Sequence, residues 1–223
     1  MEIHSPELVG AEKYSVLPNS LFIDHYNKAK AFTLEFYKDT FDKYLRLEFS
    51  NTTPQKFFEE VVWVVHASGF SAKAVGKFIP RIMVKYGTVE DCANTPIDYL
   101  ISEVAPVCNN PAKIKAVWES SRMIMDGVNT DDWRGWLLKS FTKAEDFTKF
   151  PFIGGVTCYH ISRNLGFLDS VKPDLHLNRL ADHYGFDDAK SMCEATKDSI
   201  PLGLVDLCLW YHSSSFGTLQ FKK

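Results

Sequence analysis

The chain has 223 residues, 45% of them hydrophobic, which suffices for one domain or two closely packed lobes with a buried core. Its net charge of −3 does not by itself indicate a nucleic-acid-binding protein. No apolar stretch reaches the roughly 18 residues of a membrane-spanning helix, and Met1 is not followed by a signal-like segment. We therefore expect an intracellular protein that does not associate with membranes.

Turn residues and apolar spacing predict an all-α fold. Thr53 followed by Pro54 predicts an N-cap with proline in the first turn, and Ser71 is expected to cap the next helix, which Pro80 should kink. Residues 61–65 alone could also form a strand. The expected helices span residues 26–47, 57–66, 75–83, 96–104, 111–125, 131–141, 155–165, 174–184, 187–196 and 202–212.

The five cysteines are widely separated in the sequence: Cys92, Cys108, Cys158, Cys193 and Cys208. An odd number without a signal peptide favours reduced thiols over disulfides. No two of them form a C-x-x-C pair, so we predict buried apolar thiols rather than a zinc or iron–sulfur site, and no metal ligands.

The segment 150–179 combines a glycine turn, a helix, a short loop and the acidic start of another helix. Gly154 and Gly155 allow a sharp turn and the close approach of a partner. Because this turn opens a helix, several amide N–H groups lack partners within the helix and can bind a phosphate oxygen.

Asp174 directly follows Pro173 at an expected helix start, where free amides and the helix dipole favour an ionised carboxylate. A fixed anion can stabilise an oxocarbenium-like sugar or orient a water molecule. An isolated aspartate in this position would usually be only an N-cap. The neighbouring glycine turn favours a catalytic role here.

These residues resemble the helix-hairpin-helix DNA glycosylase superfamily, which includes endonuclease III-like and alkyl-base glycosylases. The resemblance rests on the Pro-x-hydrophobic-Gly turn at 151–154 and on Asp-x-His-x-x-Arg at 174–179. In detail it covers residues 150–179, and more loosely, in the order of helices, most of the chain.

The resemblance implies two helical lobes with a DNA-binding cleft between them. One lobe would comprise residues 1–52 and 180–223, and the other residues 53–179, with the hairpin at about 143–166. A damaged or modified base of double-stranded DNA would be flipped into the cleft. The protein would be a monomer, located in the cytoplasm with the nucleoid if it is prokaryotic.

The same resemblance assigns roles to residues. Asp174 would be catalytic, His176 and Arg179 would support the helix, and the DNA backbone would contact the hairpin at Ile153, Gly154, Gly155 and Val156. Hairpin carbonyls could hold a monovalent cation. The cysteine cluster of some members is missing, so no iron–sulfur cluster is expected.

Two hairpin positions depart from the family pattern. Phe152 replaces the first hairpin glycine, which would alter the turn or weaken the grip on DNA. Val156 stands where bifunctional members carry a Schiff-base lysine. Without that amine we expect base removal alone, leaving an abasic site without lyase chemistry.

The base pocket is expected to involve Trp63, His66, Ser68 and Phe70, together with Tyr159 or His160 after the hairpin, since adjacent helical residues point in different directions. For each of these, core packing is the alternative interpretation. Lys73, Lys77 and Arg81 form either a phosphate-facing stripe or an ordinary solvated face. The acidic pairs 131–132 and 187–188 are interpreted as helix caps.

The leading hypothesis is thus a monofunctional DNA glycosylase of base-excision repair. An alkylated purine suits the aromatic pocket. An oxidised purine, or a modified pyrimidine of phage DNA, remains open, and the latter would indicate antiviral defence. The alternatives from other classes are a non-catalytic DNA-binding module and a helical protein-interaction domain.

Overall fold

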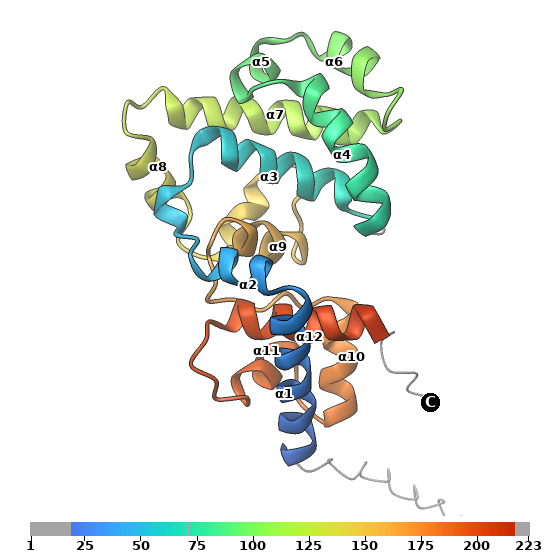
Figure 1. Cartoon of the computed structure of the whole chain (residues 1–223). Helices are drawn as coiled ribbons and strands as arrows, with labels where there is room; N and C mark the ends of the chain where they lie inside the picture. Colours follow the sequence, from blue (N-terminus) through green and yellow to red (C-terminus); the bar gives the residue numbers. More distant parts are fainter. Residues whose placement is uncertain (1–18, 71, 217–223) are drawn as a thin grey trace, which may run out of the picture.

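The computed structural model describes residues 19–70 and 72–216, which form helices with no strand among them (Figure 1). This confirms the predicted all-α fold. In chain order the elements are α1 (Asn19–Phe36), α2 (Lys38–Leu45), the 3₁₀ helix η1 (Phe49–Asn51), α3 (Pro54–Ala67), α4 (Ala72–Tyr86), α5 (Val89–Asn94), α6 (Ile97–Val104), α7 (Pro111–Val128), α8 (Trp133–Ser140), the 3₁₀ helix η2 (Ala144–Lys149), α9 (Thr157–Asn164), α10 (Leu175–Tyr184), α11 (Ala189–Glu194) and α12 (Leu202–Phe216).

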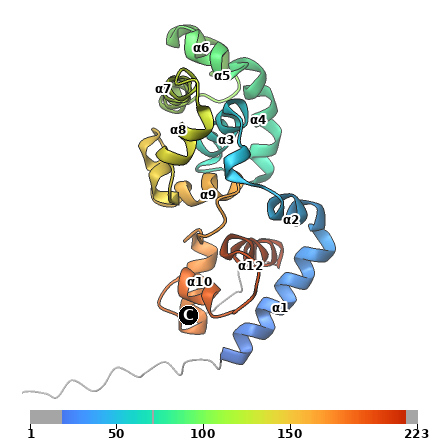
Figure 2. The same ribbon diagram turned by 90° about the vertical axis from the view of Figure 1, so that its left-hand side faces the viewer.

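Two separate hydrophobic cores divide these elements into two lobes, visible one above the other in Figures 1 and 2. The central lobe contains η1 to α9, and the terminal lobe contains α1, α2 and α10 to α12. Leu168, Val171 and Leu177 pack in the core of the terminal lobe. The chain therefore passes from the central lobe to the terminal lobe soon after α9, and not at residue 179 as the sequence suggests.

Side-chain caps define several helix starts. The Thr53 hydroxyl accepts a hydrogen bond from the Lys56 amide at the start of α3, and Pro54 follows in the first turn. Asp132 and Asp188 cap α8 and α11, so the expected capping role of the two acidic pairs is confirmed. Ser71 lies outside the described residues, and α4 continues through Pro80.

The sequence predicts one helix over residues 26–47, whereas the structure has α1 and α2 with a break at Tyr37. The Tyr37 backbone leaves the helical conformation, with φ −133°, and its ring stacks on Tyr211 of α12 at a centroid distance of 4.0 Å. A tertiary contact thus overrides the local helical pattern. The break lets α2 depart from the axis of α1 toward the central lobe (Figure 2).

Three short elements, η1, α5 and η2, are absent from the sequence-based prediction. Thr88 and Asp91 form a capping box at the start of α5, which is a local signal that was present in the sequence. The 3₁₀ helix η2 precedes the glycine turn, and its Phe147 packs with Phe141 and Phe150 in an aromatic cluster of the central core. This cluster holds the base of the hairpin in place.

Candidate active site

A cavity of about 730 Å³ is lined by residues of both lobes. The central lobe contributes the end of α3, the turn after it, and α9, whereas the terminal lobe contributes α2 and α12. The segment that links the lobes supplies Lys172 and Asp174. Val156 of the predicted hairpin and Asp174 of the acidic motif therefore meet at one cavity, which we call the interlobe cavity, whereas Ile153, Gly154 and Gly155 do not line it.

Asp174 occupies the N-cap of α10, as its position after Pro173 predicts. Its Oδ1 accepts hydrogen bonds from the amides of His176, at 2.9 Å, and Leu177, at 3.1 Å. Its Oδ2 lies 3.4 Å from Nζ of Lys172. The side chain is only 12% exposed, and that remainder lines the interlobe cavity. These contacts fix the carboxylate in position, as catalysis by charge stabilisation requires.

The glycine turn presents free amides, but they differ in part from those expected. The Ile153 amide donates to the Phe150 carbonyl, and the Gly154 amide donates to the Thr157 hydroxyl. The amides of Gly155, Val156 and Thr157 have no hydrogen-bond partner within the described chain. The amides that are free to bind an anion therefore lie at the start of α9. The sequence analysis expected free amides at Ile153 and Gly154, but both are already hydrogen-bonded within the turn. Thr157, which the sequence analysis did not name, provides a free amide instead.

Phe152 takes the backbone conformation of the glycine that it replaces in the family pattern. Its φ is +66°, in the left-handed region that favours glycine. Its side chain is half exposed. The left-handed backbone at this non-glycine residue therefore stores strain in the turn.

The turn after α3 carries predicted pocket residues and is held by a buried lysine. Nζ of Lys113 donates to the carbonyls of His66, at 3.2 Å, and Ser68, at 2.5 Å. It also lies 5.1 Å from the centre of the Phe70 ring. The positive charge at the carboxyl end of α3 thus stabilises the turn, which brings Ser68 and Phe70 to the interlobe cavity.

Four of the predicted pocket residues line the interlobe cavity: Trp63, Ser68, Phe70 and His160. The other two do not. His66 is fully buried in the central core, where its Nε2 lies 3.0 Å from the hydroxyl of Tyr86 at the end of α4. The prediction of His66 as a pocket residue is wrong, and the alternative of a core histidine holds.

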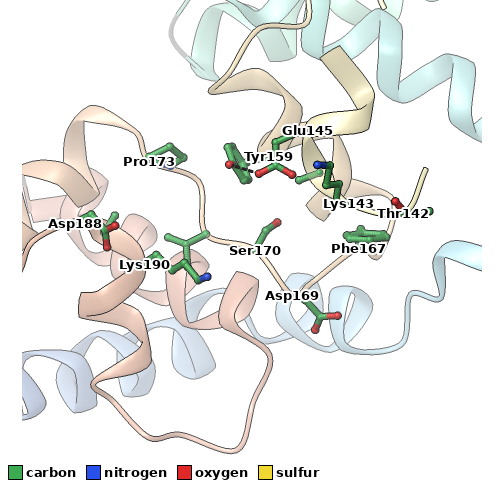
Figure 3. A pocket seen from close by; sticks show the side chains of 13 residues that line it. Thr142, Lys143, Glu145, Tyr159, Phe167, Asp169, Ser170, Pro173, Asp188 and Lys190 are labelled. Carbon is green, nitrogen blue, oxygen red and sulfur yellow. Dashed lines mark hydrogen bonds between the residues drawn. The ribbon is translucent and has the colours of Figure 1, made fainter. Parts of the chain in front are cut away.

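Tyr159 lies on the other side of α9, at a second cavity of about 500 Å³ (Figure 3). Its hydroxyl donates to Oε1 of Glu145 at 2.6 Å. The linking segment separates the two cavities, since Val171 and Pro173 line the second one and Lys172 and Asp174 line the first. Of the adjacent pair after the hairpin, His160 is therefore the residue that faces Asp174's cavity.

The interlobe cavity has a polar wall that the sequence analysis did not identify. Nη1 of Arg163 donates to Oδ1 of Asp206 at 3.0 Å, and both side chains are buried. Nearby, Asn164 donates to Glu60 and accepts from the Tyr44 hydroxyl. The only available signal was Asp206 itself, a charged residue inside the apolar stretch of α12.

Burial of His160 lowers its pKa well below its ordinary value, and the positive charges of Arg163 and Lys172 act in the same direction. His160 is therefore a neutral imidazole near pH 7. Burial raises the pKa of Asp206, and Arg163 opposes that effect. The site thus combines a neutral hydrogen-bonding ring with a buried ion pair.

The remaining predicted residues lie at the surface or have partners elsewhere. Lys77 and Arg81 are exposed on α4, and the side chain of Lys73 lies outside the described part of the chain. Arg179 is exposed and makes no ion pair or hydrogen bond with the described residues, so the expected support of the helix by Arg179 is not seen. His176 is half-buried next to Asp174 and contributes its amide.

The cysteines are all buried and free. Within residues 19–70 and 72–216, no three His, Cys, Asp or Glu side chains are grouped so that they could hold a metal ion. None of the helices in these ranges is long and apolar enough to cross a bilayer.

No protein-family model and no curated protein sequence matches the chain. Solved structures do match its fold. The 8-oxoguanine DNA glycosylase of Thermotoga maritima is 18% identical, with a TM-score of 0.64 over 87% of this chain and 96% of that chain. An 8-oxoguanine glycosylase/lyase of Methanocaldococcus jannaschii, in complex with a DNA 15mer that contains 8-oxoguanine, is also 18% identical, with a TM-score of 0.62 over 85% and 97%.

An endonuclease III, trapped as a covalent intermediate with DNA, is 14% identical and has a TM-score of 0.57 over 86% of this chain and 83% of that chain. At such identities the comparison concerns the fold. The chain therefore shares the fold of these three proteins over most of its length.

Proposed function

We propose that this protein is a DNA glycosylase that accepts a flipped, modified base in the interlobe cavity and hydrolyses its N-glycosidic bond. The observation that carries the proposal is the position of Asp174: a fixed carboxylate and the hairpin residues Val156 and Thr157 line the same cavity. Binding of the DNA backbone at the hairpin would then bring the sugar to the carboxylate. The names of the structural neighbours from Thermotoga maritima and Methanocaldococcus jannaschii, which are 8-oxoguanine glycosylases, support this function.

In this mechanism Asp174 stabilises the positive charge that develops on the sugar as the bond to the base breaks. Its Oδ1 accepts two amide hydrogen bonds, and Oδ2, which also lies 3.4 Å from Nζ of Lys172, is the oxygen that would face the sugar or a water molecule. Trp63 and Phe70 provide apolar faces for the base, and neutral His160 is available for hydrogen bonding.

We further propose that the enzyme is monofunctional and leaves an intact abasic site. Val156 has no amine, and Nζ of Lys172 lies 3.4 Å from Oδ2 of Asp174, where it pairs with the carboxylate instead of serving as the nucleophile. One neighbour is named a glycosylase/lyase, which makes lyase activity the property to test. The proposed enzyme acts as an intracellular monomer on double-stranded DNA, without a cofactor.

The test is incubation with duplexes that carry oxidised purines, alkylated purines or modified pyrimidines, followed by alkali to reveal abasic sites. Wild-type protein should produce alkali-labile sites, and Asp174→Asn should reduce their rate at least about 100-fold. Asparagine is also a good N-cap, so this variant retains the start of α10. Asp132→Asn, at the exposed N-cap of α8, is the matched control and should cleave normally.

Two results would reject the enzyme. Salt-sensitive DNA binding without abasic sites in any duplex would indicate a non-catalytic DNA-binding module, and absence of DNA binding would indicate a helical protein-interaction domain.

A further inference from the structure

The guanidinium of Arg163 is a buried cation with unused hydrogen-bonding capacity in the wall of the interlobe cavity. The side chain is 7% exposed, and its one hydrogen bond within the described chain joins Nη1 to Oδ1 of Asp206. The buried Nε has no partner among the described residues. An arginine carries several N–H donors, and a buried donor without a partner is costly.

Asp206 cannot satisfy the other donors of Arg163. It is fully buried, and its second oxygen accepts the Lys172 amide at 2.7 Å. The contact is therefore a single hydrogen bond, whereas arginine–carboxylate pairs that serve stability are frequently bidentate. Asp206 orients the guanidinium at the cavity and leaves the rest of the planar group free for a ligand.

The other charged groups at the cavity are already matched. Lys172 pairs with Asp174, and Glu60 pairs with Lys56 at 2.5 Å and accepts a hydrogen bond from Asn164. His160, which is neutral, adds no charge next to Arg163. Among the charged side chains that line the cavity, Arg163 is therefore the one with a buried donor that has no partner in the described residues.

We propose that Arg163 determines specificity by donating to an oxygen acceptor on the flipped base, so that the substrate is a neutral or acidic base bearing an exposed oxygen. This inference rests on the proposed glycosylase function. A cationic purine alkylated at N7 would face the positive guanidinium, and its alkylated imidazole edge would offer no acceptor to the free N–H groups. The substrate class thus differs from the alkylated purine that the aromatic residues alone suggest.

Matched duplexes test the proposal. 8-oxoguanine and 7-methylguanine differ at the imidazole edge, where one carries a carbonyl and the other a cationic methylated ring. 5-carboxylcytosine carries a carboxylate at the ring position where 5-methylcytosine carries a methyl group. Dissociation constants are measured with the Asp174→Asn protein, which is not expected to turn over, and excision rates with the wild-type active site.

We expect the oxygen-bearing base of at least one pair to bind about tenfold or more tightly than its methyl partner. Arg163→Lys keeps a charge for Asp206 but lacks the planar fork, and it should lose most of this discrimination. The double variant Arg163→Gln with Asp206→Asn removes both buried charges and provides a second test if the lysine variant does not fold. Thermal unfolding verifies that each variant is folded.

The inference is overturned if the methylated partners bind as well as the oxygen-bearing bases, or if folded Arg163 variants discriminate as the parent does. If the protein excises bases but its discrimination does not depend on Arg163, the role of Arg163 is rejected and the glycosylase activity is supported. If discrimination requires Arg163 but the wild-type protein excises no base, Arg163 belongs to a base-binding site and the glycosylase activity is rejected. If the protein shows neither a binding preference nor excision, both proposals are rejected.

Discussion

Nζ of Lys172 lies 3.4 Å from Oδ2 of Asp174, and both side chains line the interlobe cavity. A lysine amine is thus present beside the proposed catalytic carboxylate, although the hairpin position that the family uses for its lysine holds Val156. In the monofunctional mechanism that we propose, Lys172 holds the carboxylate and does not attack the sugar.

Borohydride trapping distinguishes these roles. With a duplex that contains a preformed abasic site, we expect no covalent protein–DNA product, because neither Val156 nor the paired Lys172 offers a free amine. A trapped product that disappears in Lys172→Arg, but persists in Lys143→Arg at the second cavity, would show that Lys172 forms a Schiff base and that the enzyme is bifunctional.

Gly154→Ala and Gly155→Ala should weaken DNA binding without changing stability. A Cβ at either position meets no atom within 4 Å, so the folded protein accommodates it. The same methyl group would stand between the amides of the turn and a phosphate oxygen. We expect about tenfold weaker binding and a smaller salt dependence, measured by fluorescence anisotropy at several salt concentrations.

The matched control for these variants is Gly76→Ala in α4, where a Cβ also meets nothing within 4 Å. It should bind DNA as the wild type does. Wild-type affinity in both hairpin variants would mean that the backbone of this turn does not contact phosphate.

The strain at Phe152 is measurable by comparing two replacements. Both Phe152→Ala and Phe152→Gly remove the half-exposed ring, but only glycine accepts a φ of +66° without strain. We expect the glycine variant to be more stable than the alanine variant by about 1 kcal/mol in urea unfolding. At Val156, where φ is −100°, the order should be reversed. The same order at both positions would indicate that the hairpin is not strained at Phe152.

Acid should destabilise the central lobe through His66. Burial lowers its pKa to about 4, with Lys113 acting in the same direction, whereas the unfolded chain binds the proton near the ordinary pKa of 6.5. Between these values the unfolded state binds more protons, so the free energy of unfolding falls as the pH is lowered. The stabilisation is complete above the unfolded pKa and is lost as the pH approaches about 4.

At about pH 5 the expected loss from His66 is up to about 2 kcal/mol relative to neutral pH. Urea unfolding of the wild type and of His66→Gln across this range measures it, and the variant should show the weaker pH dependence. His25, whose pKa burial also lowers to about 4, remains in both proteins and contributes equally. Identical pH profiles would mean that His66 does not titrate on unfolding.

Most of the helices and the central motif could be predicted because their signals are local. Thr53 with Pro54, and Asp174 after Pro173, are capping patterns that need only neighbouring amides. The break at Tyr37 could not be predicted in this way, since it coincides with a stacking contact with Tyr211, far away in the sequence. The orientation of His66 likewise depends on Tyr86 and on the packing of α3.

The sequence by itself determined the all-α class, the glycine turn and the acidic helix start, because backbone conformation and capping are governed by adjacent residues. Only the tertiary structure decided what surrounds Asp174. Arg163 from α9 and Asp206 from α12 form an ion pair in one wall. The Lys172 amide donates to Asp206, and the Lys172 ammonium pairs with Asp174. Such a pairing depends on how two lobes close on each other, and burial, which sets the strength of these charges, arises only from that closure.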